Sequence, residues 1–171
     1  NVIDPVEVLE KHGLDAFRYY FSKHVDTFLD ADFTWEKFEN AYRNELANDY
    51  GNLVQRLSVL CQKNGVEKID FNPTFNGAYV ALMDQFEFTN AINFAWNMVQ
   101  AVNRHIEEQK PWQIAKTDIA EARVILTNLV QELLLANHHL KPFLPIAESV
   151  EQLFVSSGEI LPPKTPLFPK D

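Results

Sequence analysis

The chain contains a stretch of 80 residues, between Gly77 and Gly158, that has no glycine and only three prolines. Glycine and proline most often interrupt regular secondary structure, so this stretch favours long elements. Its apolar residues recur every three or four positions, as in the series Ile92, Ala95, Val99, Val102 and Ile106. Such spacing is typical of amphipathic helices. The stretch therefore predicts long helices that end near Pro111 and Pro142.

Start and stop signals of helices are also present near the beginning of the chain. Asp4 followed by Pro5 predicts a helix start with Asp4 as its N-cap, and Gly13 predicts the end of that helix. A second helix is expected from about residue 14 to 24. Its cluster of four aromatic residues is expected to lie partly in the core.

A longer helix is predicted over residues 35–63. Thr34 precedes it as a candidate N-cap, and Gly65 follows it as a stop signal. One apolar stripe runs along this helix at Leu46, Tyr50, Leu53, Leu57 and Leu60. The following residues, 66–75, are expected to form a loop.

The remaining helices are predicted at about 78–86, 89–109, 118–140 and 145–157. Thr89 and Thr117 are the candidate N-caps of the two long ones, and Pro145 is the candidate first residue of the last. The proline-rich tail is expected to be extended. With about seven helices and no convincing strand, the predicted fold is all-α, an antiparallel helical bundle preceded by a short helical segment.

Composition bounds the class of protein. The 171 residues include 15 basic and 24 acidic ones, for a formal net charge of −9, and 46% are apolar. That apolar fraction is enough for the core of one domain, which argues against a disordered chain. The negative charge argues against a protein that grips nucleic-acid backbone over its whole surface, but it is compatible with a local RNA site.

Features that the sequence lacks indicate where the protein is found, and the lack of a second cysteine favours a reducing compartment. Cys61 is the single cysteine, so no disulfide can form within the chain. No apolar run approaches the roughly 20 residues of a membrane span, and the acidic first residues are unlike a signal peptide. We therefore expect a cytoplasmic protein without membrane contact. Because the sequence begins with Asn rather than Met, we also expect a piece of a longer polypeptide, monomeric by itself.

Motifs of enzyme catalysis are missing from the sequence. It has neither a glycine-rich phosphate loop nor a G-x-S-x-G nucleophile elbow. Cys61 lies on the apolar stripe of the helix over 35–63 and is interpreted as a buried thiol. His138 and His139 are adjacent, so they lie on different helix faces, and we expect one to be packed and the other solvated. We predict no catalytic residue and no metal site.

Asn52 and Arg56 are the first candidate binding residues. Four positions apart on the helix over 35–63, they lie on one face. The amide and the guanidinium could together hydrogen-bond the edge of an unstacked base. The helical spacing by itself favours the alternative that Asn52 and Arg56 are ordinary polar residues beside the apolar stripe, without a binding role. Gly51 beside them costs about 1 kcal/mol relative to Ala in a helix, which a close approach by another backbone could explain.

Lys110-Pro111-Trp112 is the second candidate motif. A tryptophan directly after a helix-breaking proline lies at a corner between two helices. If its ring is exposed, it offers a stacking surface for a base, worth about 1–3 kcal/mol. Packing of the ring against the bundle is the alternative, and taken alone it is the favoured one.

Motifs over nearly the whole chain resemble class I aminoacyl-tRNA synthetases. Residues 1–5 and 13–20 resemble the segment that directly follows the K-M-S-K-S signature of that class. Three blocks are similar to methionyl-tRNA synthetases in particular: NELANDYGNLVQR at 44–56, KPW at 110–112 and PFLP at 142–145. The H-I-G-H and K-M-S-K-S motifs are missing, and so is the family's zinc-binding insertion.

The resemblance implies a domain organisation. Residues 1–32 would be the end of the stem-contact region that connects to the catalytic domain. Residues 33–171 would be the helical anticodon-binding domain. ATP and Mg²⁺ would belong to the missing catalytic domain, so this chain would hold no cofactor and would not charge tRNA by itself. Its partners would be the anticodon stem-loop of tRNA(Met) and its own catalytic domain.

The resemblance also assigns roles to the candidate residues. In this family, the Asn and Arg of the N-L-x-x-R block and the Trp of the K-P-W block read the CAU anticodon. By position, Asn52 and Arg56 would hydrogen-bond unstacked bases, and Trp112 would stack on one. Pro111 would set the position of the tryptophan.

Two alternatives stay open from the sequence: the anticodon domain of a related class I synthetase, and a helical protein-interaction module without an RNA role. The charge distribution bears on them. Residues 41–63 hold three basic and two acidic side chains, and residues 93–123 hold four of each. The acidity therefore lies away from both motifs. We expect few phosphate contacts and a shallow salt dependence of RNA binding.

Overall fold

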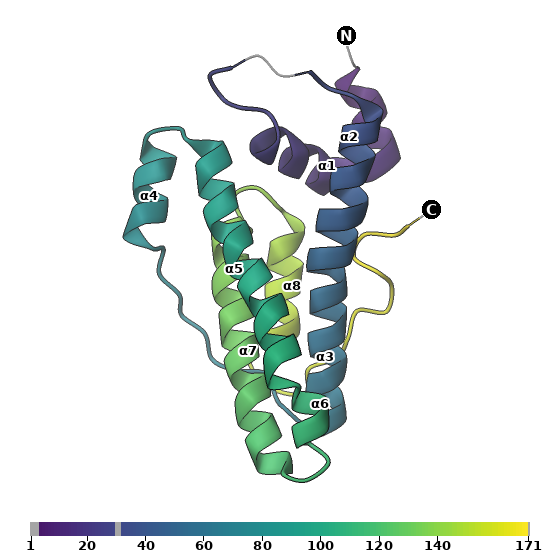
Figure 1. The fold of residues 1–171 in the computed structure, drawn as a ribbon, viewed down its shortest axis with the longest axis vertical. Coiled ribbons are helices and arrows are strands. Elements are labelled where there is room, and N and C mark those ends of the chain that lie inside the picture. Colours follow the sequence, from purple (N-terminus) through teal and green to yellow (C-terminus); the bar gives the residue numbers. More distant parts are fainter. Residues whose placement is uncertain (1–3, 30–31, 171) are drawn as a thin grey trace.

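The structure is a computed structural model that describes residues 4–29 and 32–170 (Figure 1). These residues form eight α-helices, one π-helical segment and no β-strand, which confirms the predicted all-α fold. The elements in chain order are α1 (Pro5–Lys23), α2 (Trp35–Ala41), η1 (Tyr42–Gly51), α3 (Asn52–Asn64), α4 (Gly77–Asp84), α5 (Phe88–Gln109), α6 (Pro111–Ile114), α7 (Ile119–Leu140) and α8 (Ile146–Phe154). Two domain ranges were predicted, 1–32 and 33–171. The structure does not describe residues 1–3, 30 and 31 of the first range or residue 171 of the second.

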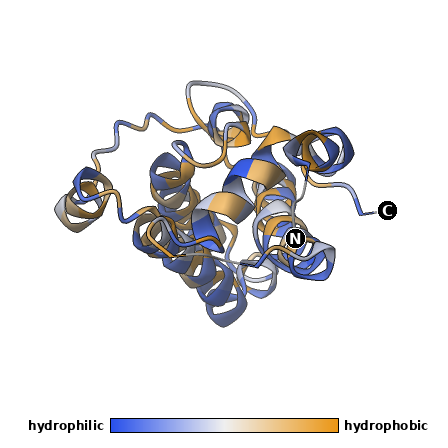
Figure 2. Cartoon of the chain, turned by 90° about the horizontal axis from the view of Figure 1, so that it is seen from above, coloured by the Kyte–Doolittle hydropathy of each residue, from blue (hydrophilic) through white to orange (hydrophobic). Residues whose placement is uncertain are grey.

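The core lies between the long helices. α7 packs against α5, α3 and α8, and α1 packs against α5 and η1. Both predicted apolar stripes point into this core, where all their residues are buried except the half-buried Leu60. Figure 2 shows hydrophobic and hydrophilic colours side by side on most helices, as expected for amphipathic helices. None of the described helices is long and apolar enough to cross a membrane.

The first helix bends where the sequence predicts a stop. The Asp4 side chain accepts a hydrogen bond from the Val6 N–H at 2.9 Å, as the predicted N-cap does. At Gly13 the backbone has φ 81° and ψ 172°, a conformation that is open almost only to glycine. α1 is therefore two helical segments joined at this residue, with the second ending at Lys23.

Helix formation continues without a break from Trp35 to Asn64, but its middle is a π-helix. The Thr34 side chain caps the start, and Gly65 ends it with a left-handed backbone, both as predicted. η1 was not predicted from the sequence. In it the N–H groups bond five residues back, as Asn52 N–H does to Ala47 O.

Two predicted caps are wrong. α5 begins at Phe88, after Glu87, so Thr89 lies inside the helix and its hydroxyl donates to the Ser22 carbonyl at 3.3 Å. α7 is capped by Asp118 and not by Thr117, because the Asp118 carboxylate accepts from the Glu121 N–H at 3.0 Å. A carboxylate at this position also gains from the positive end of the helix dipole.

The C-terminal tail runs back along η1 and α3. Phe168 is only 6% exposed, and the Tyr42 hydroxyl donates to the Pro169 carbonyl at 2.9 Å. The Phe168 ring also explains Gly51: a Cβ there would lie 3.5 Å from Phe168 Cδ2 and 3.1 Å from Leu46 O. The atoms that crowd this glycine are therefore a side chain of the tail and a carbonyl of the same helix, and not another backbone as expected.

Candidate functional site

Asn52 and Arg56 line one recess on the outer face of α3. The recess is open to solvent and has a volume of about 610 Å³. Asn52 is exposed and Arg56 is half-buried, so both can meet a ligand from solvent. The other lining residues are Asn48, Leu53, Gln55, Val59, Leu60 and Asn103. The helix face that Asn52 and Arg56 were predicted to share therefore carries a recess, and the amide of Asn52 and the guanidinium of Arg56 line it.

Trp112 lies directly beside this recess. Lys110 has a left-handed backbone (φ 45°) that turns the chain out of α5, and the buried Pro111 starts the short helix α6. Trp112 is half-buried against the core, which is intermediate between the exposed and the packed alternatives. The guanidinium carbon of Arg56 is 4.7 Å from the centroid of the Trp112 ring. The structure thus brings the two motifs together in a cation–π contact.

Glu107 holds the Arg56 guanidinium in this position. Arg56 Nη1 donates to the Glu107 carboxylate, and the side chains are 38% and 60% exposed. An ion pair this exposed contributes little to the stability of the fold. Its main effect is to orient the Arg56 guanidinium over the Trp112 ring. A base that stacks on the covered ring face has to displace Arg56.

Asn103 connects the recess to the π-helix. Its Nδ2 donates to the Asp49 carbonyl of η1 at 3.1 Å. Asn103 and Glu107 are four residues apart on α5, so they share a helix face, as Asn52 and Arg56 do on α3. The sequence did not identify Asn48, Gln55 or Glu107 as candidate binding residues, and Glu107 was expected only to be part of a solvated helix face. The repeated four-residue spacing of polar residues on α5 was the signal that could have found Glu107.

A second polar cluster, centred on Glu45, joins α1 to η1. Glu45 Oε2 accepts from the Tyr19 hydroxyl, from Lys23 Nζ at 2.6 Å, and lies 3.0 Å from His24 Nε2. Burial by itself raises the pKa of Glu45, but the hydrogen bonds from His24, Lys23 and Tyr19 outweigh it and lower the pKa to about 2. Glu45 is therefore ionised at neutral pH, and the cluster fixes α1 on the bundle.

The other titratable residues singled out from the sequence are structural. Cys61 is fully buried, as predicted, and burial raises the pKa of its thiol to about 12. His139 is packed: its Nε2 lies 3.0 Å from the Asn76 N–H and its Nδ1 lies 2.8 Å from the Leu135 carbonyl. His138 is half-buried and stacks on Phe75, so it is solvated only in part. In the described ranges, no three His, Cys, Asp or Glu side chains are grouped as metal ligands would be.

Known proteins resemble this chain along most of its length. A family model of class I tRNA synthetases (M) matches residues 1–58. The methionine–tRNA ligase of Listeria innocua is 32% identical over 161 residues, which are 84% of this chain and 24% of that protein. The Bacillus subtilis ligase is 31% identical over 175 residues, 92% of this chain and 26% of that protein. The chain thus spans about a quarter of the length of these curated relatives.

Solved structures agree with this relationship. Mycobacterium tuberculosis methionyl-tRNA synthetase bound by methionyl-adenylate superposes with a TM-score of 0.80 at 25% identity, over 99% of this chain and 40% of that one. The apo form of the same enzyme gives a TM-score of 0.79 at 24% identity, over 98% of this chain and 41% of that one. On the sequence matches, which the shared fold supports, the chain belongs to the methionyl-tRNA synthetase family.

Proposed function

We propose that this chain binds the anticodon loop of tRNA(Met) and reads its CAU triplet. The observation that carries the proposal is the contact between Arg56 and Trp112, which joins two motifs from distant parts of the sequence at one recess. An indole surface beside an amide and a guanidinium is the combination that single-stranded RNA loops require, because their unstacked bases are read by stacking and by hydrogen bonds to their edges.

Each residue has a separate task in this proposal. Trp112 provides the surface on which one base stacks, and Pro111 fixes the corner that presents it. Arg56 provides two parallel donors for a base edge or a phosphate. Asn52 provides one donor and one acceptor edge on the rim of the recess.

Aminoacylation itself belongs to the longer protein in this proposal. The H-I-G-H and K-M-S-K-S motifs are not in the sequence. The relatives are methionine–tRNA ligases of about four times this length. We infer that the chain acts with the ATP-dependent catalytic domain of such a ligase, and that it selects the tRNA which that domain charges.

A panel of anticodon stem-loops tests the proposal. The affinity of the chain is measured by fluorescence anisotropy for the CAU loop, for isoleucine, valine and leucine anticodon loops, and for an unrelated hairpin. We expect the CAU loop to bind most tightly. Tightest binding of another loop would contradict the reading of CAU, and binding no tighter than the unrelated hairpin would favour a protein-interaction role.

A further inference from the structure

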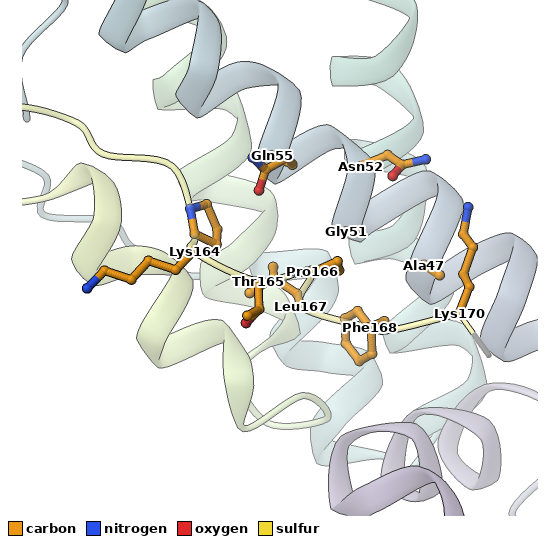
Figure 3. Close-up of a pocket in the computed structure, with 11 residues that line it drawn as sticks. Ala47, Gly51, Asn52, Gln55, Lys164, Thr165, Pro166, Leu167, Phe168 and Lys170 are labelled. Atoms are coloured by element: carbon orange, nitrogen blue, oxygen red, sulfur yellow. The ribbon is translucent and has the colours of Figure 1, made fainter.

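A second hollow lies on the other side of Asn52, between α3 and the C-terminal tail (Figure 3). It encloses about 400 Å³, and we call it the tail groove. Ala47, Gly51, Asn52 and Gln55 form its helix side, and residues 163–168 with Lys170 form its tail side. We propose that the tail groove binds one further nucleotide of the RNA loop, next to the bases at Asn52 and Arg56. This inference rests on the proposed function.

The two hollows are neighbours that share part of their lining. Asn52 and Gln55 line both the recess beside Arg56 and the tail groove. Figure 3 shows the two side chains on α3 with the tail running past them. A single strand whose bases occupy the recess therefore has its neighbouring nucleotide at the mouth of the tail groove.

The walls of the tail groove suit a nucleobase. Gly51, Pro166 and Leu167 provide apolar surface, while Gln55 and Thr165 provide an amide and a hydroxyl. These polar groups can donate to and accept from a base edge. The volume of this half-open groove falls in the range of small-ligand sites, about 300–1,000 Å³.

The charge at the groove is opposite to that of the whole chain. Residues 160–170 contain Lys164 and Lys170 and no acidic side chain, whereas the chain has a net charge of −9. Lys170 Nζ donates to Asn48 Oδ1, which holds the ammonium at the rim near Asn52. Lys164 is exposed at the other end. Cations at both ends favour the phosphates that flank a nucleotide.

The groove is formed before any ligand arrives. Phe168 is buried over Gly51, and the Tyr42 hydroxyl holds the Pro169 carbonyl, so the tail is anchored beyond the groove. Residues 163–167 run past Gln55 and form the wall of the groove that faces it (Figure 3). A preformed site avoids much of the cost of ordering a loop on binding.

An abasic scan of the RNA loop tests the inference. Each nucleotide outside the CAU triplet is replaced in turn by an abasic residue, and the affinity of the chain is measured. In the wild type, we expect one such position to weaken binding about tenfold, because the abasic residue loses the hydrogen bonds and the apolar contacts that the base makes in the groove. Because the abasic scan uses only the wild-type chain, a folding defect of a protein variant cannot affect its result.

A double variant then locates the effect. In Gln55→Leu/Thr165→Val, we expect the same abasic replacement to cost less than about threefold, because the base has already lost its partners. The matched control is Gln62→Leu/Thr74→Val, since both residues are exposed and line neither hollow. It should keep the tenfold loss.

The outcomes separate this inference from the proposed function. If no position outside the triplet matters, or if the double variant shows the full loss, the tail groove holds no nucleotide while the preference for CAU still stands. If the wild type shows no preference for CAU, the proposed function fails and the groove inference fails with it.

Discussion

Trp112 contributes both to the candidate site and to the core, and substitution can separate the two roles. Its ring lies under Arg56 and is half-buried. Trp112→Ala should weaken binding of the CAU loop about tenfold or more, since stacking of a base on an aromatic ring is worth about 1–3 kcal/mol. It should also cost about 2 kcal/mol of stability, roughly half of what a fully buried tryptophan costs. Anisotropy and thermal melting measure the two effects.

Trp35→Ala is the matched control for Trp112. Trp35 is also half-buried, but it lies on α2 and packs on Phe33 and Phe38. Its loss should lower the melting temperature to a similar extent and leave RNA affinity unchanged. A Trp112→Ala protein that melts far lower but retains its RNA affinity would mean that Trp112 is only a core residue.

Glu45 should make the stability of the chain depend on acid pH. Its pKa falls from 4.5 to about 2 on folding, so its contribution is fully present above about pH 5 and disappears as the pH falls from 4.5 towards 2. The shift corresponds to a contribution on the order of 3 kcal/mol at neutral pH, for a side chain that is 22% exposed. Glu45→Gln should therefore be less stable in urea unfolding at pH 7, and nearly equal to the wild type near pH 2.

Glu36→Gln controls for a general effect of removing a carboxylate. Glu36 is exposed on α2 and should change stability by less than about 0.5 kcal/mol at either pH. An unchanged difference between Glu45→Gln and the wild type from pH 7 to pH 2 would contradict the assigned role of the Glu45 cluster.

At the scale of elements, Gly13 is the residue that shapes α1. Nothing lies within 4 Å of a Cβ placed there, so only the backbone conformation opposes a side chain. Gly13→Ala should cost about 1–3 kcal/mol, because φ 81° with ψ 172° is strained for any residue with a Cβ. Denaturant unfolding measures this cost.

Gly77→Ala provides the comparison. Gly77 begins α4, also has nothing within 4 Å of a Cβ, and has no left-handed backbone. The alanine should be neutral or stabilise the chain by up to about 1 kcal/mol. Equal effects of the two substitutions would show that α1 does not depend on the conformation of Gly13.

Most helices could be predicted because their signals are local. Asp4, Thr34 and Gly65 act within one turn of a helix end, and the apolar stripes follow from helical spacing. Thr117 was mistaken for a cap because Asp118, its neighbour, is equally suited to the role. η1 could not be predicted, since a shift from bonds four residues back to bonds five residues back has no residue signature in this sequence.

The site could be predicted only in part for the same reason. The shared face of Asn52 and Arg56 follows from their spacing on one helix. The contact of Arg56 with Trp112 and its pairing with Glu107 depend on how α3 packs beside α5 and α6, which no local pattern specifies. The tail groove depends on Phe168 returning to Gly51, a contact between residues far apart in the chain.

At the scale of the whole molecule, the charge distribution limits how RNA can be held. Three cations lie at the two hollows, namely Arg56, Lys164 and Lys170. Two or three phosphate contacts with single-stranded RNA give a slope of roughly −1 to −2 in a plot of log K against log salt concentration. Titrations of the CAU loop between low and high salt should show this shallow slope. A slope steeper than about −4 would mean that phosphate contacts, and not bases, dominate binding.

The central claim is that the recess lined by Asn52 and Arg56, together with Trp112 beside it, reads anticodon bases. The most direct measurement compares the affinity of the chain for two stem-loops that differ only in the first base of CAU, in the wild type and in Arg56→Ala. We expect the wild type to prefer the CAU loop by about tenfold or more, since one well-matched base contact is worth about 1–3 kcal/mol, and Arg56→Ala to lose most of that preference. Equal affinity of the wild type for both loops, or an unchanged preference in Arg56→Ala, would contradict the claim.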